Sequence, residues 1–157
     1  MNPGRVLVED RQETVALDTD RWVALAGGVL EAEGVAPDAE LGLAFVEPGE
    51  MADLNRRFLG GDGPTDVLAF PLDSPEGSVG PALLGDVVVC PAVAAENAPG
   101  HAGSLDDELA LLVVHGALHV LGHDHAEGQD RRLMRDRERA LLARFHVPLT
   151  ADPWAET

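Results

Sequence analysis

An eleven-residue stretch, residues 115–125, constrains this chain more than any other part of its sequence. It reads His-Gly-Ala-Leu-His-Val-Leu-Gly-His-Asp-His and holds four of the six histidines. His115 and His119 are four positions apart, so on a helix their side chains lie on one face, one turn apart. Gly122 can adopt the left-handed conformation that ends a helix, so the chain can turn back and bring His125 toward the other two. The stretch therefore predicts a helix, a sharp stop and a return.

Three neutral imidazoles that converge on one point and leave a coordination position open are typical of a catalytic zinc site. The spacing is that of the zinc helix of metzincin proteases, which carry a glutamate directly after the first histidine as general base. Here that position is Gly116, which makes peptide hydrolysis less favoured. We predict about one zinc per chain, bound by His115, His119 and His125. The alternative is a polar helix end whose histidines face water.

Composition limits the possible partners and compartment. The net charge is −17, and all eleven basic residues are arginine. General affinity for nucleic acid depends on neutralising phosphates, so any RNA contact must come from a local basic patch and the metal. Cys90 is the only cysteine and lies in an apolar run, which favours a packed side chain in a reducing compartment. The chain starts without a signal-peptide pattern and its apolar runs are short, so we expect a cytoplasmic protein with no membrane partner.

Hydrophobic periodicity predicts a single α+β domain over residues 1–157. The expected fold is a mixed sheet of about four strands packed by helices, with a metzincin-like zinc helix. Ser104 is expected to begin the histidine-bearing helix, with Asp107 in the capping-box position. The tail, residues 148–157, is expected to be frayed. Strands are predicted at 5–9, 40–46, 66–70 and 83–90, and helices at 19–33, 48–58, from 91, from 105 and at 127–145.

Taken together, the motifs resemble the YbeY family of bacterial metal-dependent endoribonucleases, which mature ribosomal RNA. The family signature H-G-x-L-H-L-x-G-Y-D-H matches residues 115–125. A second block, L-N-x-x-(Y/F) followed by P-T-(D/N)-V-L-S-F-P, matches residues 54–58 and 64–71, and an L-G-D strand matches residues 84–86. Three ordered motifs thus cover about residues 54–125. The resemblance implies a single-strand-directed endoribonuclease that acts on precursor ribosomal RNA, with the ribosome or its small subunit as partner.

Two departures from the family pattern affect the expected substrate contacts. Many members carry an arginine where this chain has Leu59, so that role cannot be transferred. Arg56 or Arg57, on the same predicted helix, are the candidates to replace it. His123 stands where the family has tyrosine and is expected to face solvent or contact substrate rather than bind the metal.

Three carboxylates are candidates for the catalytic chemistry. Asp66 and Asp86 begin or interrupt apolar strands, where an acid either serves a strand-end turn or faces the metal as proton acceptor. Asp124 either orients a ligand histidine or caps the turn. The arginines of the last helix are read as a solvated, ion-paired face, with phosphate binding as the alternative. His101 and His146 are expected to be ordinary surface or loop residues.

Two other functions remain open at this point. A metallopeptidase of metzincin-like type is disfavoured by Gly116. A non-catalytic ribosome-assembly factor with a structural metal would be indicated by a closed site with four protein ligands, His123 included, whereas an open position would indicate an enzyme.

Overall fold

The computed structural model describes residues 5–72, 83–122 and 128–154, with the backbone alone for residues 128–130. Four strands form one sheet in the order β1-β2-β4-β3. β1, β2 and β4 run parallel, and β3 is antiparallel to β4. This confirms the mixed four-stranded sheet. The strands are β1 (Val6–Arg11), β2 (Glu40–Val46), β3 (Val67–Pro71) and β4 (Leu83–Val89).

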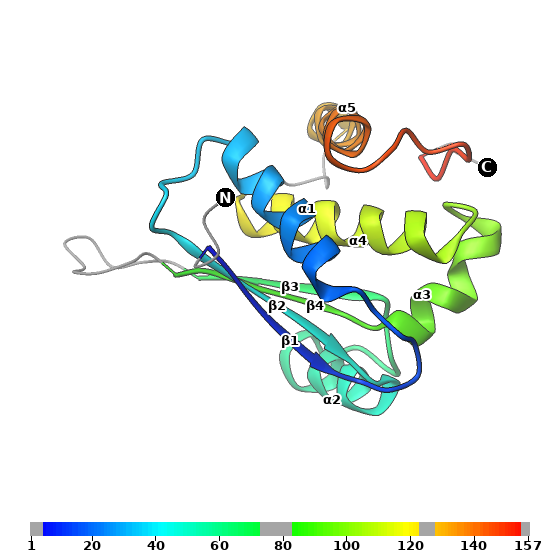
Figure 1. The fold of residues 1–157 in the computed structure, drawn as a ribbon. Coiled ribbons are helices and arrows are strands. Elements are labelled where there is room, and N and C mark those ends of the chain that lie inside the picture. The colour runs from blue at the N-terminus through cyan, green and yellow to red at the C-terminus, as the bar shows by residue number, and fades with distance from the viewer. Residues whose placement is uncertain (1–4, 73–82, 123–127, 155–157) are drawn as a thin grey trace.

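The helices pack on both faces of this sheet. Figure 1 shows α1 and α4 over one face, α2 under the other, and α5 lying over α1 and α4. The α+β class predicted from periodicity is therefore confirmed. In the described part of the chain, no helix combines the length and apolar character needed to cross a membrane. The helices are α1 (Thr19–Ala32), α2 (Pro48–Leu59), α3 (Pro91–Asn97), the 3-10 turn η1 (Ala98–Gly100), α4 (Leu105–Val120) and α5 (Gly128–Phe145).

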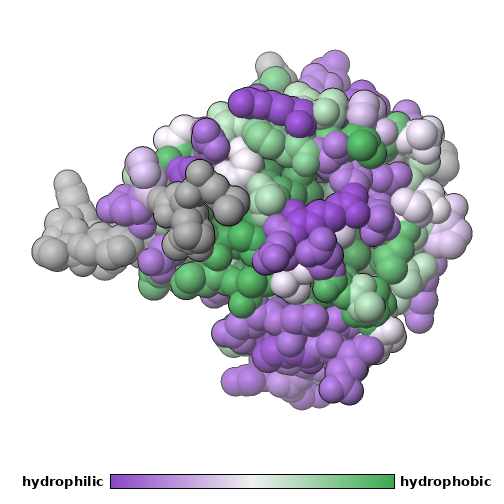
Figure 2. Space-filling model, viewed as in Figure 1, coloured by the Kyte–Doolittle hydropathy of each residue, from purple (hydrophilic) through white to green (hydrophobic). Residues whose placement is uncertain are grey.

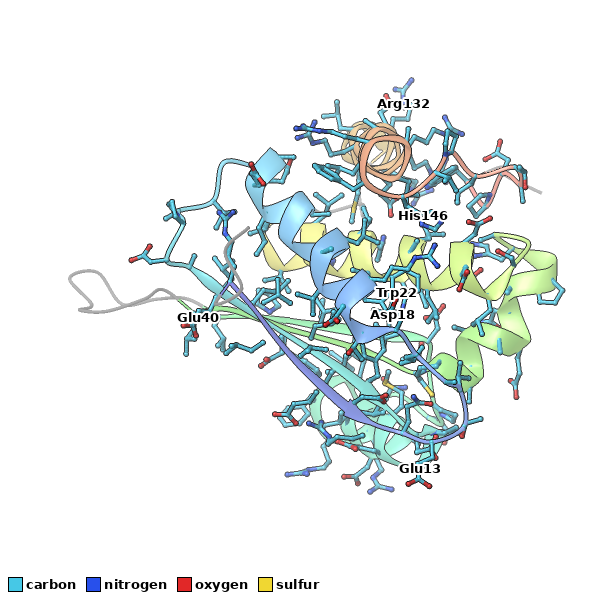
Figure 3. All side chains as sticks on the ribbon, viewed as in Figure 1. Glu13, Asp18, Trp22, Glu40, Arg132 and His146 are labelled. Atoms are coloured by element: carbon cyan, nitrogen blue, oxygen red, sulfur yellow. The ribbon has the colours of Figure 1, made fainter. Side chains whose placement is uncertain are left out.

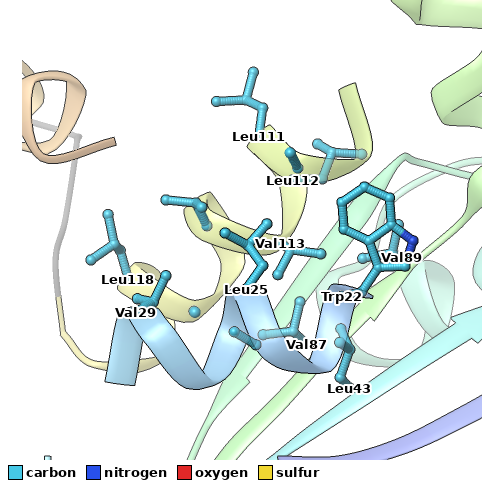
Figure 4. Close-up of a cluster of buried hydrophobic side chains, with 14 of the residues drawn as sticks. Trp22, Leu25, Val29, Leu43, Val87, Val89, Leu111, Leu112, Val113 and Leu118 are labelled. Carbon is cyan, nitrogen blue, oxygen red and sulfur yellow. The ribbon is translucent and has the colours of Figure 1, made fainter. Parts of the chain in front are cut away.

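Alternation along the strands divides the apolar side chains between two cores. The larger core lies between the sheet and helices α1 and α4, where Trp22, Val87 and Val113 meet (Figure 4). The smaller core lies under the sheet against α2 and includes Met51 and Cys90. Cys90 is fully buried, and burial raises the pKa of its thiol, so it behaves as a packed hydrophobic side chain.

Helix α4 begins and ends where its sequence indicates. The Ser104 hydroxyl oxygen accepts a hydrogen bond from the Asp107 backbone N–H at 3.1 Å, which is the predicted N-cap. At the other end, Gly122 has a φ of 99°, a conformation that favours glycine, and its N–H donates to the His119 carbonyl at 3.0 Å. The helix that carries His115 and His119 is thus limited by local signals at both ends.

Gly116 faces the sheet, and it explains how closely α4 packs there. A Cβ atom at this position would lie 2.5 Å from Cγ1 of Val87 and 3.4 Å from Cγ2 of Val67. Any larger side chain would be directed into the strands. A glutamate at the position of the protease base would therefore clash with β4.

The tail, for which the sequence predicts a frayed end from residue 148 onward, is described as far as residue 154. Its described part packs against α5: the Arg139 guanidinium lies 4.7 Å from the centre of the Trp154 ring, and Arg139 pairs with Asp152 at 3.3 Å. Residues 155–157 lie outside the described part.

Candidate active site

His115 and His119 lie on one face of α4, as their spacing predicts. Both are partly buried, and their ring centres are 6.4 Å apart. His123, Asp124 and His125 fall outside the described residues, so the three-histidine site stays a prediction. Among residues 5–72, 83–122 and 128–154, no group of three metal-binding side chains occurs.

A buried carboxylate from α5 holds the first of these histidines. Glu138 is 4% exposed, and its Oε2 lies 3.0 Å from Nδ1 of His115. Its Oε1 accepts a hydrogen bond from the Trp154 indole N–H at 3.2 Å. An ionised carboxylate only accepts hydrogen bonds, so Nδ1 of His115 is the donor. Nε2 is then the ring nitrogen that can bind a metal.

This donor set fits a divalent metal. Metal-binding histidines typically donate the second ring N–H to a carboxylate, which selects the tautomer and fixes the ring. Glu138 does this for His115, and His119 presents a second imidazole one turn along the same helix. The described residues therefore include two of the three expected ligands, both on one face of α4.

A pocket of about 420 Å³ opens beside His115. It lies between α4, α5, the start of β3 and the tail. Asp66 lines it, so the structure brings this carboxylate to the same pocket as His115. Arg131 and Arg135 of α5 also line it, which places two positive charges in a wall of an otherwise acidic protein. The pocket thus combines an oriented imidazole, a carboxylate and two guanidinium groups, a set that suits a phosphodiester.

Asp86 does not reach this pocket. It is neighbour to Val87, whose side chain faces Gly116 of α4, and alternation along β4 therefore directs Asp86 to the opposite face of the sheet. On that face the Oδ1 atom of Asp86 occupies the space that a Cβ atom at Gly42 would need. Asp86 also lines a separate groove of about 850 Å³. Asp86 and His115 therefore line different pockets, and a role of Asp86 at the metal stays a prediction.

Arg56 and Arg57 also lie away from His115. They belong to α2, which lies on the opposite face of the sheet from α4 (Figure 1) and forms the hydrophilic region at the bottom of Figure 2. Both are exposed and pair with Asp53, at 2.6 Å for Arg56 and 3.6 Å for Arg57. Leu59 lines the groove under the sheet. The structure therefore shows two ion-paired helix arginines and does not bring them to the pocket.

Sequence reasoning missed three side chains of this pocket. Glu138 comes from the last helix, where nothing distinguishes one buried acid from the many exposed charges. Trp154 comes from the tail. His101, expected to be an ordinary loop residue, lines the same pocket as His115, and its Nδ1 pairs with the buried Glu108. The available signal was Glu108 itself, an acid placed directly before an apolar run of α4.

Comparison with known proteins identifies the class. Residues 7–146 match the family described as endoribonuclease YbeY. The endoribonuclease YbeY of Salinispora tropica is 50% identical over 139 residues, covering 81% of this chain and 87% of that protein. Those of Thermobifida fusca and Frankia casuarinae are 45% and 46% identical, covering 82% and 88% of this chain and 86% and 73% of theirs. The chain belongs to the YbeY endoribonuclease family.

A solved structure supports the fold. The solution structure of TM1509 from Thermotoga maritima aligns with a TM-score of 0.59 at 23% sequence identity. The alignment covers 96% of this chain and 99% of that one.

Proposed function

We propose that this protein cuts single-stranded RNA in the pocket beside His115, as a zinc-dependent endoribonuclease. Family membership assigns it an endoribonuclease activity, dependence on a metal and a role in processing ribosomal RNA. The observation that carries the proposal is the meeting of His115, held by Glu138, with Asp66, Arg131 and Arg135 in one pocket. We further propose that precursor ribosomal RNA is cut on the ribosome or its small subunit, in the cytoplasm.

His115, His119 and His125 are the proposed ligands of about one zinc ion per chain. When bound, the metal supplies Lewis-acid stabilisation of the negative charge that develops on the phosphodiester. Asp124 is proposed to orient a ligand histidine and His123 to contact substrate, both on sequence grounds alone.

The described side chains have separate roles in this proposal. Arg131 and Arg135 bind phosphate groups of the RNA and hold the strand in the pocket. A carboxylate oxygen of Asp66 accepts the proton that the attacking water loses. Glu138 keeps His115 in one tautomer and one orientation, and Trp154 in turn holds Glu138.

Peptide hydrolysis is the weaker alternative. The general base of the metzincin arrangement would have to stand at Gly116, whose Cβ position is filled by Val87 of the sheet. The arginines of the pocket wall favour a polyanion over a peptide.

The test measures metal content and both activities on the same preparations. The purified protein is expected to hold about one zinc per chain, to cleave a single-stranded oligoribonucleotide and to leave a peptide library intact. Chelation abolishes cleavage, and His119→Ala removes both metal and cleavage, because two remaining ligands hold zinc weakly. Peptide cleavage that depends on His115, without RNA cleavage by metal-replete protein, would reverse the assignment. Full metal content in the His119→Ala variant would place the metal elsewhere.

A further inference from the structure

A second buried glutamate stands behind a second histidine of the pocket. Glu108 lies in the first turn of α4 and is 0% exposed. A buried carboxylate is unfavourable unless its oxygens accept hydrogen bonds. Oε1 of Glu108 accepts from the Ala102 backbone N–H at 3.1 Å, and both of its oxygens lie 2.9 Å from Nδ1 of His101. These contacts attach the loop before α4 to the helix itself.

The imidazole of His101 is consequently fixed in orientation and tautomer. Its backbone N–H donates to the Ala98 carbonyl at 3.1 Å, and the Gly103 N–H donates to the same carbonyl at 2.7 Å. With Glu108 ionised, its carboxylate only accepts hydrogen bonds, and Nδ1 of His101 is then the donor. The side chain is 41% exposed although Nδ1 faces a fully buried group, so the exposed part is the ring edge that carries Nε2. In the neutral ring that nitrogen is a hydrogen-bond acceptor.

A hydrogen-bond acceptor in this pocket favours the groups of RNA that donate hydrogen bonds. His101 lines the same pocket as His115, Arg131 and Arg135. Phosphate oxygens are acceptors and are matched by the arginines, whereas a neutral imidazole with Nδ1 protonated matches a hydroxyl donor. The hydroxyl donor along the backbone of an RNA strand is the ribose 2′-OH, the group that distinguishes RNA from DNA.

We propose that Nε2 of the neutral His101 ring accepts a hydrogen bond from a ribose 2′-hydroxyl of the bound strand, and that Glu108 is the positioning residue that fixes the ring with Nδ1 as its donor. His101 is then a determinant of the preference for RNA over DNA. The inference rests on the proposed function, since it places the RNA strand in the pocket beside His115.

The experiment compares binding of three single strands of one sequence to metal-replete protein. The strands carry 2′-hydroxyl, 2′-deoxy or 2′-O-methyl groups, and fluorescence anisotropy is read before measurable cleavage. His101→Asn keeps an amide N–H near the place of Nδ1, and so keeps the contact with Glu108, but removes the nitrogen that faces the pocket. We expect it to weaken binding of the 2′-hydroxyl strand about fivefold and to leave the other two dissociation constants unchanged. His101→Gln, which returns an acceptor to the pocket edge, is expected to recover part of the preference.

A matched control comes from another histidine whose carboxylate partner belongs to the first turn of α4. His146 pairs with Asp107 at 2.8 Å through Nε2 and lies between α5 and Trp22 of α1 (Figure 3). It is not among the described residues that line the pocket. His146→Asn should therefore leave the ratio of the RNA and DNA dissociation constants unchanged even if it lowers the melting temperature.

Three outcomes would overturn the proposal. Equal weakening of all three strands by His101→Asn would indicate a phosphate or base contact. Unchanged binding in that variant would show that His101 serves only the loop. Equal affinity of the wild-type protein for RNA and DNA would remove the preference itself. Failure of the proposed function gives a different result: the wild-type protein does not cleave RNA, or its cleavage of RNA survives chelation.

Discussion

At the scale of single residues, the pocket is organised by two imidazoles whose inner nitrogens are held by buried carboxylates. Glu138 holds His115 and Glu108 holds His101. Each carboxylate is buried and would be strongly unfavourable without these donors. The same contact that satisfies the acid also removes the rotational and tautomeric freedom of the ring, so each histidine presents Nε2 in a defined direction.

This arrangement predicts that Glu138 controls metal affinity. Glu138→Ala should weaken zinc binding about 10–100-fold, the usual effect of removing the hydrogen-bond partner of a metal-binding histidine. Competition with a chelator measures this change in affinity. Nitrogen NMR shifts of the metal-free protein should show that His115 no longer favours the Nδ1–H tautomer.

Two further variants are expected to weaken zinc binding by smaller amounts. Glu138→Gln retains an acceptor oxygen and should fall between wild type and Glu138→Ala. Trp154→Phe removes the N–H that holds Oε1 and should weaken zinc binding less, in the same direction. Zinc affinity that is unchanged in Glu138→Ala would contradict the positioning role.

At the scale of elements, α4 determines which positions can carry the functional side chains. It carries His115 and His119 on one face, where His115 lines the pocket, and packs Gly116 against Val87 and Val67 on the other. Close approach of a helix to a sheet requires a small residue at the point of contact. The glycine that separates this chain from the metzincin pattern is thus a packing residue of this fold.

The close approach predicts the sign of a glycine substitution. Gly116→Ala should gain about 0.5–1 kcal/mol from reduced backbone entropy of the unfolded chain and forfeit about 1–3 kcal/mol by overpacking against Val87, a stiff β-branched side chain. The net effect is a lower free energy of unfolding, measured by denaturant titration. Gly27→Ala on α1 is the control, because a Cβ there meets nothing within 4 Å, and it should raise the free energy of unfolding. Equal stabilisation by both changes would show that the contact between α4 and β4 at Gly116 has room for a Cβ atom.

At the scale of the whole molecule, charge and topology determine how RNA can approach. A net charge of −17 repels phosphate at long range, so binding depends on cations placed locally. α5 lies over α4, which brings Arg131 and Arg135 into the pocket wall, whereas Arg132 lies on the outer side of α5 (Figure 3). Arg56 and Arg57 lie beneath the sheet with Asp53.

The salt dependence of RNA binding should separate the two arginine pairs. Arg131→Ala combined with Arg135→Ala should weaken binding of single-stranded RNA and flatten the slope of log affinity against log salt, by roughly 0.7 for each phosphate that is no longer neutralised. Arg56→Ala with Arg57→Ala should leave the slope unchanged, and zinc content should be equal in both double variants. A flatter slope in the α2 pair alone would move the RNA path to the lower face of the sheet.

Much of the fold can be predicted because its signals are local. The strand predicted at residues 40–46 has its observed bounds, and those predicted for β3 and β4 agree to within one residue at each end. Ser104 and Gly122 act on the backbone groups next to them, so the ends of α4 follow from a few neighbouring residues. The placing of His115 and His119 on one helix face needs only the helical period.

The family, the order of the elements and the pair of histidines on α4 all follow from the chain's own residues, because caps, periodicity and motif spacing act over short distances. Which face of the sheet each strand residue meets depends instead on the tertiary structure. Alternation separates Asp86 from Val87, but α4 packs on the Val87 side, and that depends on how distant elements cover the sheet. The partnership of Glu138 with His115 likewise requires α5 to fold back over α4, since contacts between separate helices leave no period in the sequence.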